Sequence, residues 1–109
     1  MSMLLITIGR LRDGGKAALE RYGEAVIPLI SAAGGEVVGR GNPQETVVGD
    51  DDRGRPDLIA LIRFPNADTI RQFLASAEYL AQMRHRDEAF VELHSYIAAD
   101  LLEVHQART

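Results

Sequence analysis

The side chains best suited to hold a small molecule lie in the second half of the chain, where Ser76, Tyr79 and Arg86 follow one another at short spacing. An arginine offers planar donors that match a carboxylate, and a tyrosine hydroxyl both donates and accepts hydrogen bonds. We expect the three residues to line a pocket between a helical region and a sheet. In the structural alternative, Ser76 caps a helix and Tyr79 packs its ring. Arg86 then pairs with a nearby acid such as Glu78 or Asp87.

Tyr22 and Arg63 complete the set of candidate ligand-binding residues. Arg63 follows a run of apolar residues at the end of a predicted strand. A charge at that place would hold an anionic ligand if the strand end faced a cavity. It would otherwise reach solvent or pair across a dimer, as long side chains do. We assign no catalytic residue from the sequence.

Metal and cofactor chemistry has little support. His85, His94 and His105 each lack a second histidine four residues away, and each is interpreted as a lone surface histidine. The run Asp50-Asp51-Asp52 lacks the further ligands and closing glutamate of a calcium loop, which indicates a solvated loop. The chain has no cysteine, so disulfides, thiolate zinc and iron–sulfur clusters are excluded. We expect neither a metal nor a cofactor, although distant residues can converge in a fold.

The composition predicts one domain over residues 1–109. The chain has 46% hydrophobic and 26% charged residues, which is ordinary for a globular protein. Its net charge of −4 argues against binding to nucleic acid. No stretch approaches the ~20 apolar residues that cross a bilayer, and no secretory signal is recognisable. We therefore expect a cytoplasmic protein without nucleic-acid or membrane partners.

The elements that must position the candidate residues begin with an apolar strand, Met3–Ile8, whose two faces are both apolar. Apolar residues at helical spacing then predict a helix over Lys16–Ala33, bent at an internal proline and ended by Gly34-Gly35. Two short extended pieces, Glu36–Gly41 and Thr46–Val48, predict one broken or bulged strand.

The second half of the chain repeats this order. Asp57–Phe64 alternates clearly and predicts the third strand, and Asn66 is a good cap for the helix after it. Ser76 is suited to cap a further helical segment that reaches Phe90. The stretch Ser95–Val104 alternates weakly and predicts a last strand.

This order predicts an α+β fold of the ferredoxin-like βαββαβ type, with a four-stranded antiparallel sheet and both helices on one face. The first and third strands are apolar on both sides, so the uncovered face needs a partner. A second copy placed sheet to sheet, as a two-fold homodimer, supplies it. The alternative is a monomer whose C-terminal helical segment folds over that face.

Several segments resemble an uncharacterised family of the dimeric α+β barrel superfamily. They are YGEAVIP (Tyr22–Pro28), the Gly34-Gly35 pair followed by Arg40-Gly41, and the stretch from Ile62 to Arg86 with its Ser76, Tyr79 and Arg86 spacing. The resemblance implies a ferredoxin-like subunit and a dimeric barrel, and it implies no reaction. Two glutamate–glycine signals usual in the family are replaced here by Val47-Val48-Gly49 and by AADLLEV near the C-terminus.

The functional expectation is a homodimer that binds a small, carboxylated or aromatic molecule, either as a binding protein or as an enzyme without a cofactor. The class of ligand rests on analogy of fold. The alternative is a non-catalytic dimerisation module, since no acid–base pair or metal set stands out in the sequence.

Overall fold

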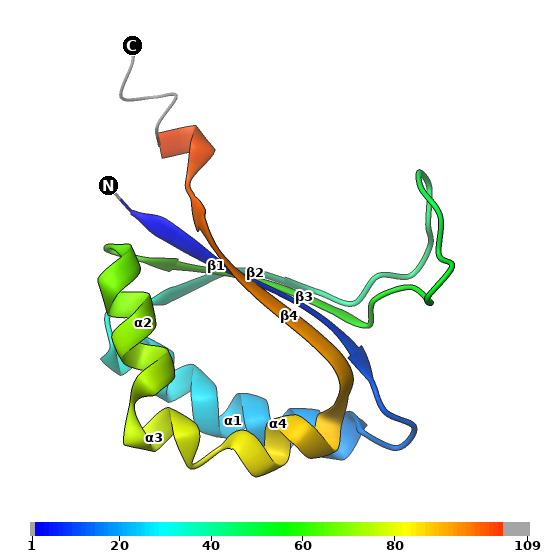
Figure 1. Ribbon diagram of the computed structural model, residues 1–109, viewed down its shortest axis with the longest axis horizontal. Helices are drawn as coiled ribbons and strands as arrows, with labels where there is room; N and C mark the ends of the chain where they lie inside the picture. Colours follow the sequence, from blue (N-terminus) through cyan, green and yellow to red (C-terminus); the bar gives the residue numbers. More distant parts are fainter. Residues whose placement is uncertain (1, 104–109) are drawn as a thin grey trace.

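The computed structural model describes residues 2–103 and contains a four-stranded antiparallel sheet with the helices on one face (Figure 1). The sheet order is β2-β3-β1-β4, which confirms the predicted ferredoxin-like α+β fold. None of the helices within residues 2–103 has the length and apolar character needed to cross a membrane. The elements are β1 (Met3–Leu11), α1 (Lys16–Ala32), β2 (Glu36–Gly41), β3 (Leu58–Phe64), α2 (Ala67–Ala75), α3 (Ala77–Leu80), α4 (Met83–Ala89) and β4 (Phe90–Ala99).

Helix α1 covers the sheet with the apolar stripe that the sequence predicts, and Val26 and Ile30 are buried. It ends at Ala32, and Gly34 follows with a φ of +90°, a left-handed conformation that glycine adopts without strain. The amide of Gly34 donates to the Ser31 carbonyl at 3.1 Å, and the amide of Gly35 donates to the Ile30 carbonyl at 2.8 Å. These two bonds satisfy the last carbonyls of the helix and confirm the predicted stop.

The second helical region is divided by its caps. Asn66 accepts from the Thr69 amide at 2.8 Å and begins α2. Ser76 then adopts an extended ψ of 147°, and its hydroxyl accepts from the Tyr79 amide at 3.2 Å to begin α3. The sequence predicts one continuing helical segment to Phe90, and this is wrong. A break separates α3 from α4, and Phe90 already begins β4.

The segment Thr46–Val48 is not part of a strand, which corrects the sequence prediction. Gly41 is the last residue of β2 paired with β3, and the chain then leaves the sheet as the loop of residues 42–57. The Asn42 side chain closes the base of this loop by donating to the Asp57 carbonyl at 2.6 Å. The valines of the predicted strand therefore have no sheet to pair with.

Strand β4 begins at Phe90, five residues before the predicted Ser95, and ends at Ala99. The reason is the length of β1, which continues to Leu11 and pairs with Phe90, so that it supplies backbone partners for an earlier start. The predicted end of this strand, Val104, lies outside the described residues.

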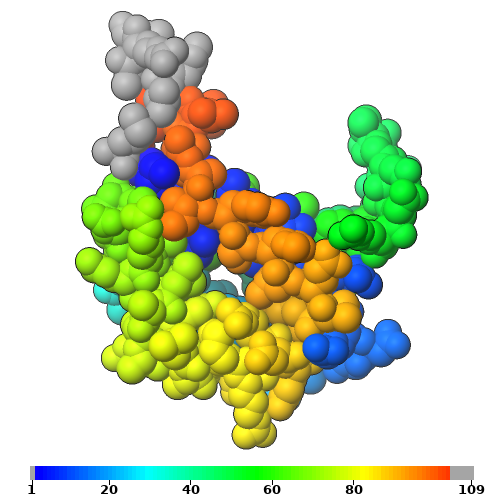
Figure 2. Space-filling view, viewed as in Figure 1, coloured from blue at the N-terminus to red at the C-terminus, as the bar shows by residue number. Residues whose placement is uncertain are grey.

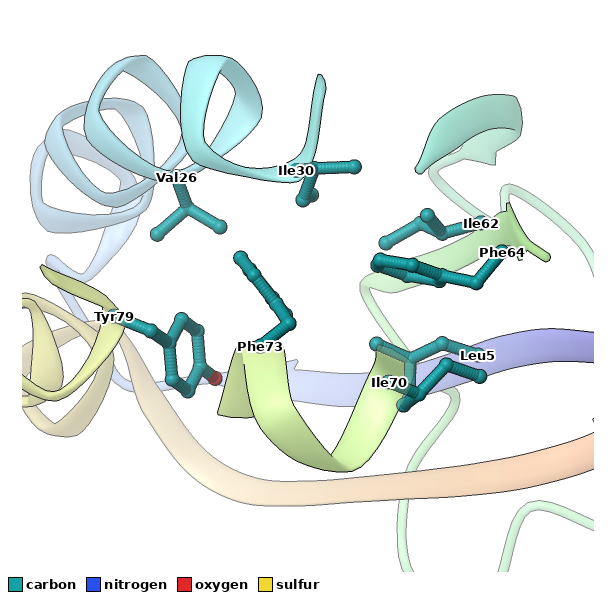
Figure 3. Close-up of a cluster of buried hydrophobic side chains, with 8 residues drawn as sticks. All are labelled: Leu5, Val26, Ile30, Ile62, Phe64, Ile70, Phe73 and Tyr79. Atoms are coloured by element: carbon teal, nitrogen blue, oxygen red, sulfur yellow. The ribbon is translucent and has the colours of Figure 1, made fainter. Parts of the chain in front are cut away.

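Two separate clusters of buried side chains hold the helices on the sheet. The larger one joins α1 and α2 to β1 and β3, and eight of its members are drawn in Figure 3: Leu5, Val26, Ile30, Ile62, Phe64, Ile70, Phe73 and Tyr79. The smaller one joins the start of α1 to the junction of α4 and β4 and consists of Ala18, Ala89 and Phe90.

The opposite face of the sheet is open and largely apolar in the single chain. Ile6 lies in its centre, with Leu61 and Tyr96 as its partners on the neighbouring strands. Ile59 is 36% exposed and Tyr96 is 54% exposed. The loop of residues 42–57 and the turn at residues 101–103 both project from the sheet on this side, away from the helices (Figure 1).

Candidate functional site

A cavity of about 70 Å³ lies between the sheet and the helices. It extends across the whole sheet, from residues of β2 to residues of β4, and its walls include members of both core clusters. Figure 2 shows the surface hollowed between the orange strand β4 and the yellow-green helical segments. The side chains that carry polar groups in its lining are Thr7, Tyr22, Arg40, Tyr79 and Ser95.

The cavity exists because a row of small residues crosses the sheet where a core would normally be filled. Thr7 of β1 pairs with Ala60 on one side and with Ser95 on the other, so all three side chains lie on the helix-facing surface. The Thr7 and Ser95 hydroxyls are 3.0 Å apart and hydrogen bond to each other. The threonine, alanine and serine side chains are smaller than a leucine or a phenylalanine. The space between the two core clusters is therefore not filled.

Two tyrosines from different helices meet at the wall of the cavity. The Tyr22 hydroxyl of α1 and the Tyr79 hydroxyl of α3 are 2.9 Å apart, and either one can be the donor. Their rings meet edge to face with centroids 6.4 Å apart. Burial and then the neighbouring Tyr79 raise the pKa of Tyr22 far above its ordinary value, while the Arg86 guanidinium lowers it slightly. Tyr22 therefore stays protonated at neutral pH.

The structure brings three of the five candidate residues together, namely Tyr22, Tyr79 and Arg86. Arg86 of α4 is near enough to act electrostatically on Tyr22, although its side chain is not part of the cavity lining. It also forms an ion pair of 3.7 Å with Asp87, as the structural alternative expected. Ser76 caps α3 and borders a separate groove between α1 and α2.

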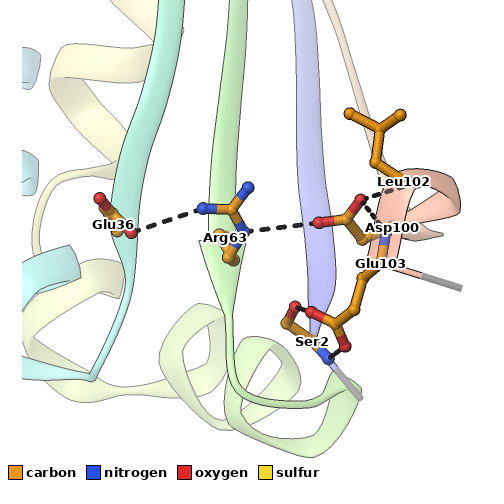
Figure 4. A network of polar contacts seen from close by, with 6 residues as sticks. All are labelled: Ser2, Glu36, Arg63, Asp100, Leu102 and Glu103. Carbon is orange, nitrogen blue, oxygen red and sulfur yellow. Dashed lines mark hydrogen bonds and ion pairs between the residues drawn. The ribbon is translucent and has the colours of Figure 1, made fainter. Parts of the chain in front are cut away.

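Arg63 lies on the opposite face of the sheet, away from the cavity. Its guanidinium bridges two carboxylates, with 3.6 Å to Glu36 and 3.4 Å to Asp100 (Figure 4). Asp100 is buried and also accepts from the amides of Leu102 and Glu103, which fixes the turn that follows β4. This network gives Arg63 a structural role at the edge of the open face.

Sequence reasoning missed three polar residues of the cavity, Thr7, Ser95 and Arg40. Arg40 turns toward the cavity because β2 changes register between Val37 and Gly39. Val37 pairs with Ile62, whereas Arg40 pairs with Ala60, so the bulge places both on the helix side of the sheet. Strict alternation would have placed Arg40 on the open face.

The histidines do not form a site within the described residues. His85 is half-buried, and its Nδ1 atom is buried without a hydrogen-bond partner in residues 2–103, which corrects the expectation of a surface side chain. His94 lies on β4 and its Nε2 is 2.9 Å from Glu92. His105 lies outside the described residues. Among residues 2–103 no three histidine, aspartate or glutamate side chains form a group that could hold a metal ion.

The comparison with protein families gives one match, to the family described as Domain of unknown function (DUF1330), over residues 7–99. No curated protein matches the chain. The match covers β2, β3, β4, the second half of β1 and all the residues that line the cavity except Leu5.

Solved structures with the same fold come from several bacteria. A protein of unknown function from Rhodopseudomonas palustris is 19% identical, with a TM-score of 0.76 over 88% of this chain and 79% of that one. A dimeric protein of unknown function and ferredoxin-like fold from Bacteroides fragilis NCTC 9343 is 12% identical, with a TM-score of 0.65 over 90% and 95%. An ethyl tert-butyl ether d (ethd) family protein from Bacillus halodurans C-125 is 17% identical, with a TM-score of 0.67 over 92% and 99%. At these identities the likeness shows the fold.

Proposed function

The chain belongs to the DUF1330 family, a family of unknown function, and from that premise we propose that it is a single-domain homodimer whose cavity binds a small, largely apolar molecule. The observation that carries the proposal is the apolar cavity between the sheet and the helices, with the Tyr22–Tyr79 hydroxyl pair in its wall. Binding pockets are typically concave and mostly apolar, with a few placed polar groups.

The cavity leaves its apolar walls without the packing contacts of a filled core, and it is open to solvent, since Arg40 and Ser95 in its lining are exposed. A single leucine at Ala60 or at Ser95 would fill much of it. Retaining small residues there supports a role for the space itself. Pockets for drug-sized ligands measure about 300–1,000 Å³, so this cavity suits a molecule of few heavy atoms.

The tyrosine pair limits the chemistry that the site supports. Tyr22 keeps its proton at neutral pH because burial and Tyr79 raise its pKa, so it does not act as a general base there. Its hydroxyl, or that of Tyr79, is suited to donate a hydrogen bond to a carbonyl, carboxylate or phenol oxygen. The pair therefore supports binding and orientation of an oxygen-bearing ligand.

The open face of the sheet supports the homodimer. Its centre is apolar, and exposed apolar patches of this kind mark interaction sites. The loop of residues 42–57 and the turn at residues 101–103 project on either side of this face and leave a hollow above it (Figure 2). Both segments carry exposed apolar side chains, since Val47, Val48, Leu101 and Leu102 are each at least 75% exposed. A second copy packed sheet to sheet would cover the face and both segments. The dimeric Bacteroides fragilis protein has the same fold.

Amide NMR with a panel of small probes tests the binding proposal. Phenol, benzoate, benzamide and hexanoate are titrated one at a time into the ¹⁵N-labelled protein. The proposal expects the largest shifts at Thr7, Ala60, Ser95 and Tyr22, around the cavity. Shifts confined to the open face, or no response to any probe, would contradict it. If no probe binds and the dimer persists, the dimerisation module is the better explanation.

A further inference from the structure

The cavity has one opening along β4 (Figure 2) and another at the β2 edge of the sheet, where the Arg40 side chain lies over Gly23. The Nη2 atom of Arg40 is 3.7 Å from the place where a Cβ atom on Gly23 of α1 would be. Both residues line the cavity, and both also line an outer groove along α1. The inner cavity and the outer groove therefore meet here, where they share Leu19, Gly23, Ile27 and Arg40.

Gly23 has no structural need to be glycine. It lies in the interior of α1, where glycine costs roughly 1 kcal/mol relative to alanine. Its φ is not in the left-handed region, and a Cβ there would meet only the guanidinium, at ordinary contact distance. By contrast, a Cβ on Gly35 would collide at 2.8 Å with Ile30 and Phe64. Packing does not require a glycine at position 23, where the cavity and the outer groove meet. The missing side chain therefore leaves a passage between the two.

Arg40 is the only charged side chain in the described lining of the cavity. The ion pairs within residues 2–103 leave its guanidinium without a carboxylate partner. The outer groove adds Lys16, Glu20 and Glu24, whose formal charges sum to −1 without Arg40. Attraction of a negatively charged ligand to its inner end therefore depends on the Arg40 guanidinium, whose planar donors match a carboxylate.

We infer that Arg40 selects an anion, so that the ligand is a small monocarboxylate whose apolar body enters past Gly23 and whose carboxylate stays at the guanidinium. This inference rests on the proposed binding function and names the ligand class. The apolar body then lies among the aliphatic and aromatic walls, with the Tyr22–Tyr79 pair available to a second oxygen.

Benzoate and benzamide test the inference, because they have nearly the same shape and differ in charge. Isothermal titration is carried out with the wild-type protein, Arg40→Gln, Arg40→Lys and the control Arg71→Gln, which removes an exposed arginine of α2 paired with Asp68. A charge-assisted pair predicts a preference for benzoate of about ten-fold or more in the wild type and the control. Arg40→Gln loses this preference, and Arg40→Lys keeps part of it.

Gly23→Leu tests the passage independently. Leucine is a far better helix former than glycine, so the melting temperature is expected to stay the same or rise. The side chain should nevertheless occupy the opening beside the Arg40 guanidinium, so benzoate should bind more weakly than it does to the wild type. A fall in melting temperature together with unchanged binding would show that Gly23 serves packing and would overturn the passage.

The outcomes separate the two proposals. Equal binding of benzoate and benzamide by the wild type, or a preference that survives Arg40→Gln, overturns the selection by Arg40 and leaves the binding function standing. Failure of phenol, benzoate, benzamide and hexanoate alike to bind the wild-type protein overturns the binding function, and the inference falls with it.

Discussion

The hydroxyls of Tyr22 and Tyr79 are 2.9 Å apart and form a hydrogen bond between α1 and α3 at the wall of the cavity. Their rings belong to a chain of aromatic contacts, in which Tyr79 packs on Phe73 with centroids 5.0 Å apart and Tyr22 meets Phe90 at 6.5 Å. Because Phe73 and Phe90 belong to different core clusters, the tyrosine pair connects the two clusters around the empty space. The hydrogen bond between the two tyrosines therefore stabilises the fold, and their hydroxyls supply polar groups to the wall of the cavity.

The hydrogen bond should be visible in a double-mutant cycle. Tyr22→Phe is expected to lower the free energy of unfolding by about 1 kcal/mol, because the buried Tyr79 hydroxyl loses its partner. Adding Tyr79→Phe should restore most of that loss, since no unpaired hydroxyl then remains. Urea unfolding of the three variants measures the coupling. Strictly additive effects would show that the two hydroxyls do not depend on each other.

Stability should fall at alkaline pH in a way that depends on Tyr22. The folded protein holds the Tyr22 proton because its pKa is raised by burial, whereas the unfolded chain releases it near pH ~10. The contribution is therefore fully present below that pH and is lost as the pH rises above it. Melting temperatures between pH 7 and 11 should decline more steeply for the wild type than for Tyr22→Phe. Parallel curves would contradict the raised pKa.

Filling the cavity should separate stability from binding. Ala60→Leu places a larger side chain in the middle of the small row, and cavity-filling changes commonly add about 0.5–2 kcal/mol. Thermal unfolding should show a melting temperature equal to or above that of the wild type. The probes that shift cavity amides in the wild type should have no effect on this variant. A destabilised variant that still binds would place the ligand elsewhere.

A charge in the centre of the open face should dissociate the dimer. Ile6 lies between Leu61 and Tyr96 on that face, so Ile6→Glu buries a carboxylate in the proposed interface. Sedimentation velocity should report a dimer for the wild type and a monomer for the variant. Leu80→Glu is the matched control, because Leu80 is an apolar residue of α3 that is 51% exposed on the helical side. A control that also dissociates would contradict the assignment of the interface.

The sequence predicts the fold well because the signals for its elements are local. The alternation along Leu58–Phe64 groups Leu58, Ala60, Ile62 and Phe64 on one face, and in β3 that face lies under the helices, with Ala60, Ile62 and Phe64 buried. Gly34 stops α1 and Ser76 caps α3, since both act through bonds within a few residues. The start of β4 was missed because it depends on the length of β1, a distant strand.

The candidate site was predicted in part. Tyr22 and Tyr79 converge as expected. Arg63 lies on the open face of the sheet, because it alternates along β3 with Ile62 and Phe64, whose side chains face the helices. Arg40 could not be assigned from alternation, because the register shift that turns it inward is a property of β2 paired with β3. Thr7 and Ser95 were missed because a small hydroxyl residue gives no signal until its neighbours across the sheet are known.

A crystal structure of the protein grown with benzoate tests the central claim most directly. We predict density for the ring beside the row of Thr7, Ala60 and Ser95, with the carboxylate within hydrogen-bond distance of the Arg40 guanidinium. Density only at surface sites, or a core whose side chains have closed the space between the two clusters, would contradict the claim that this cavity is a binding site.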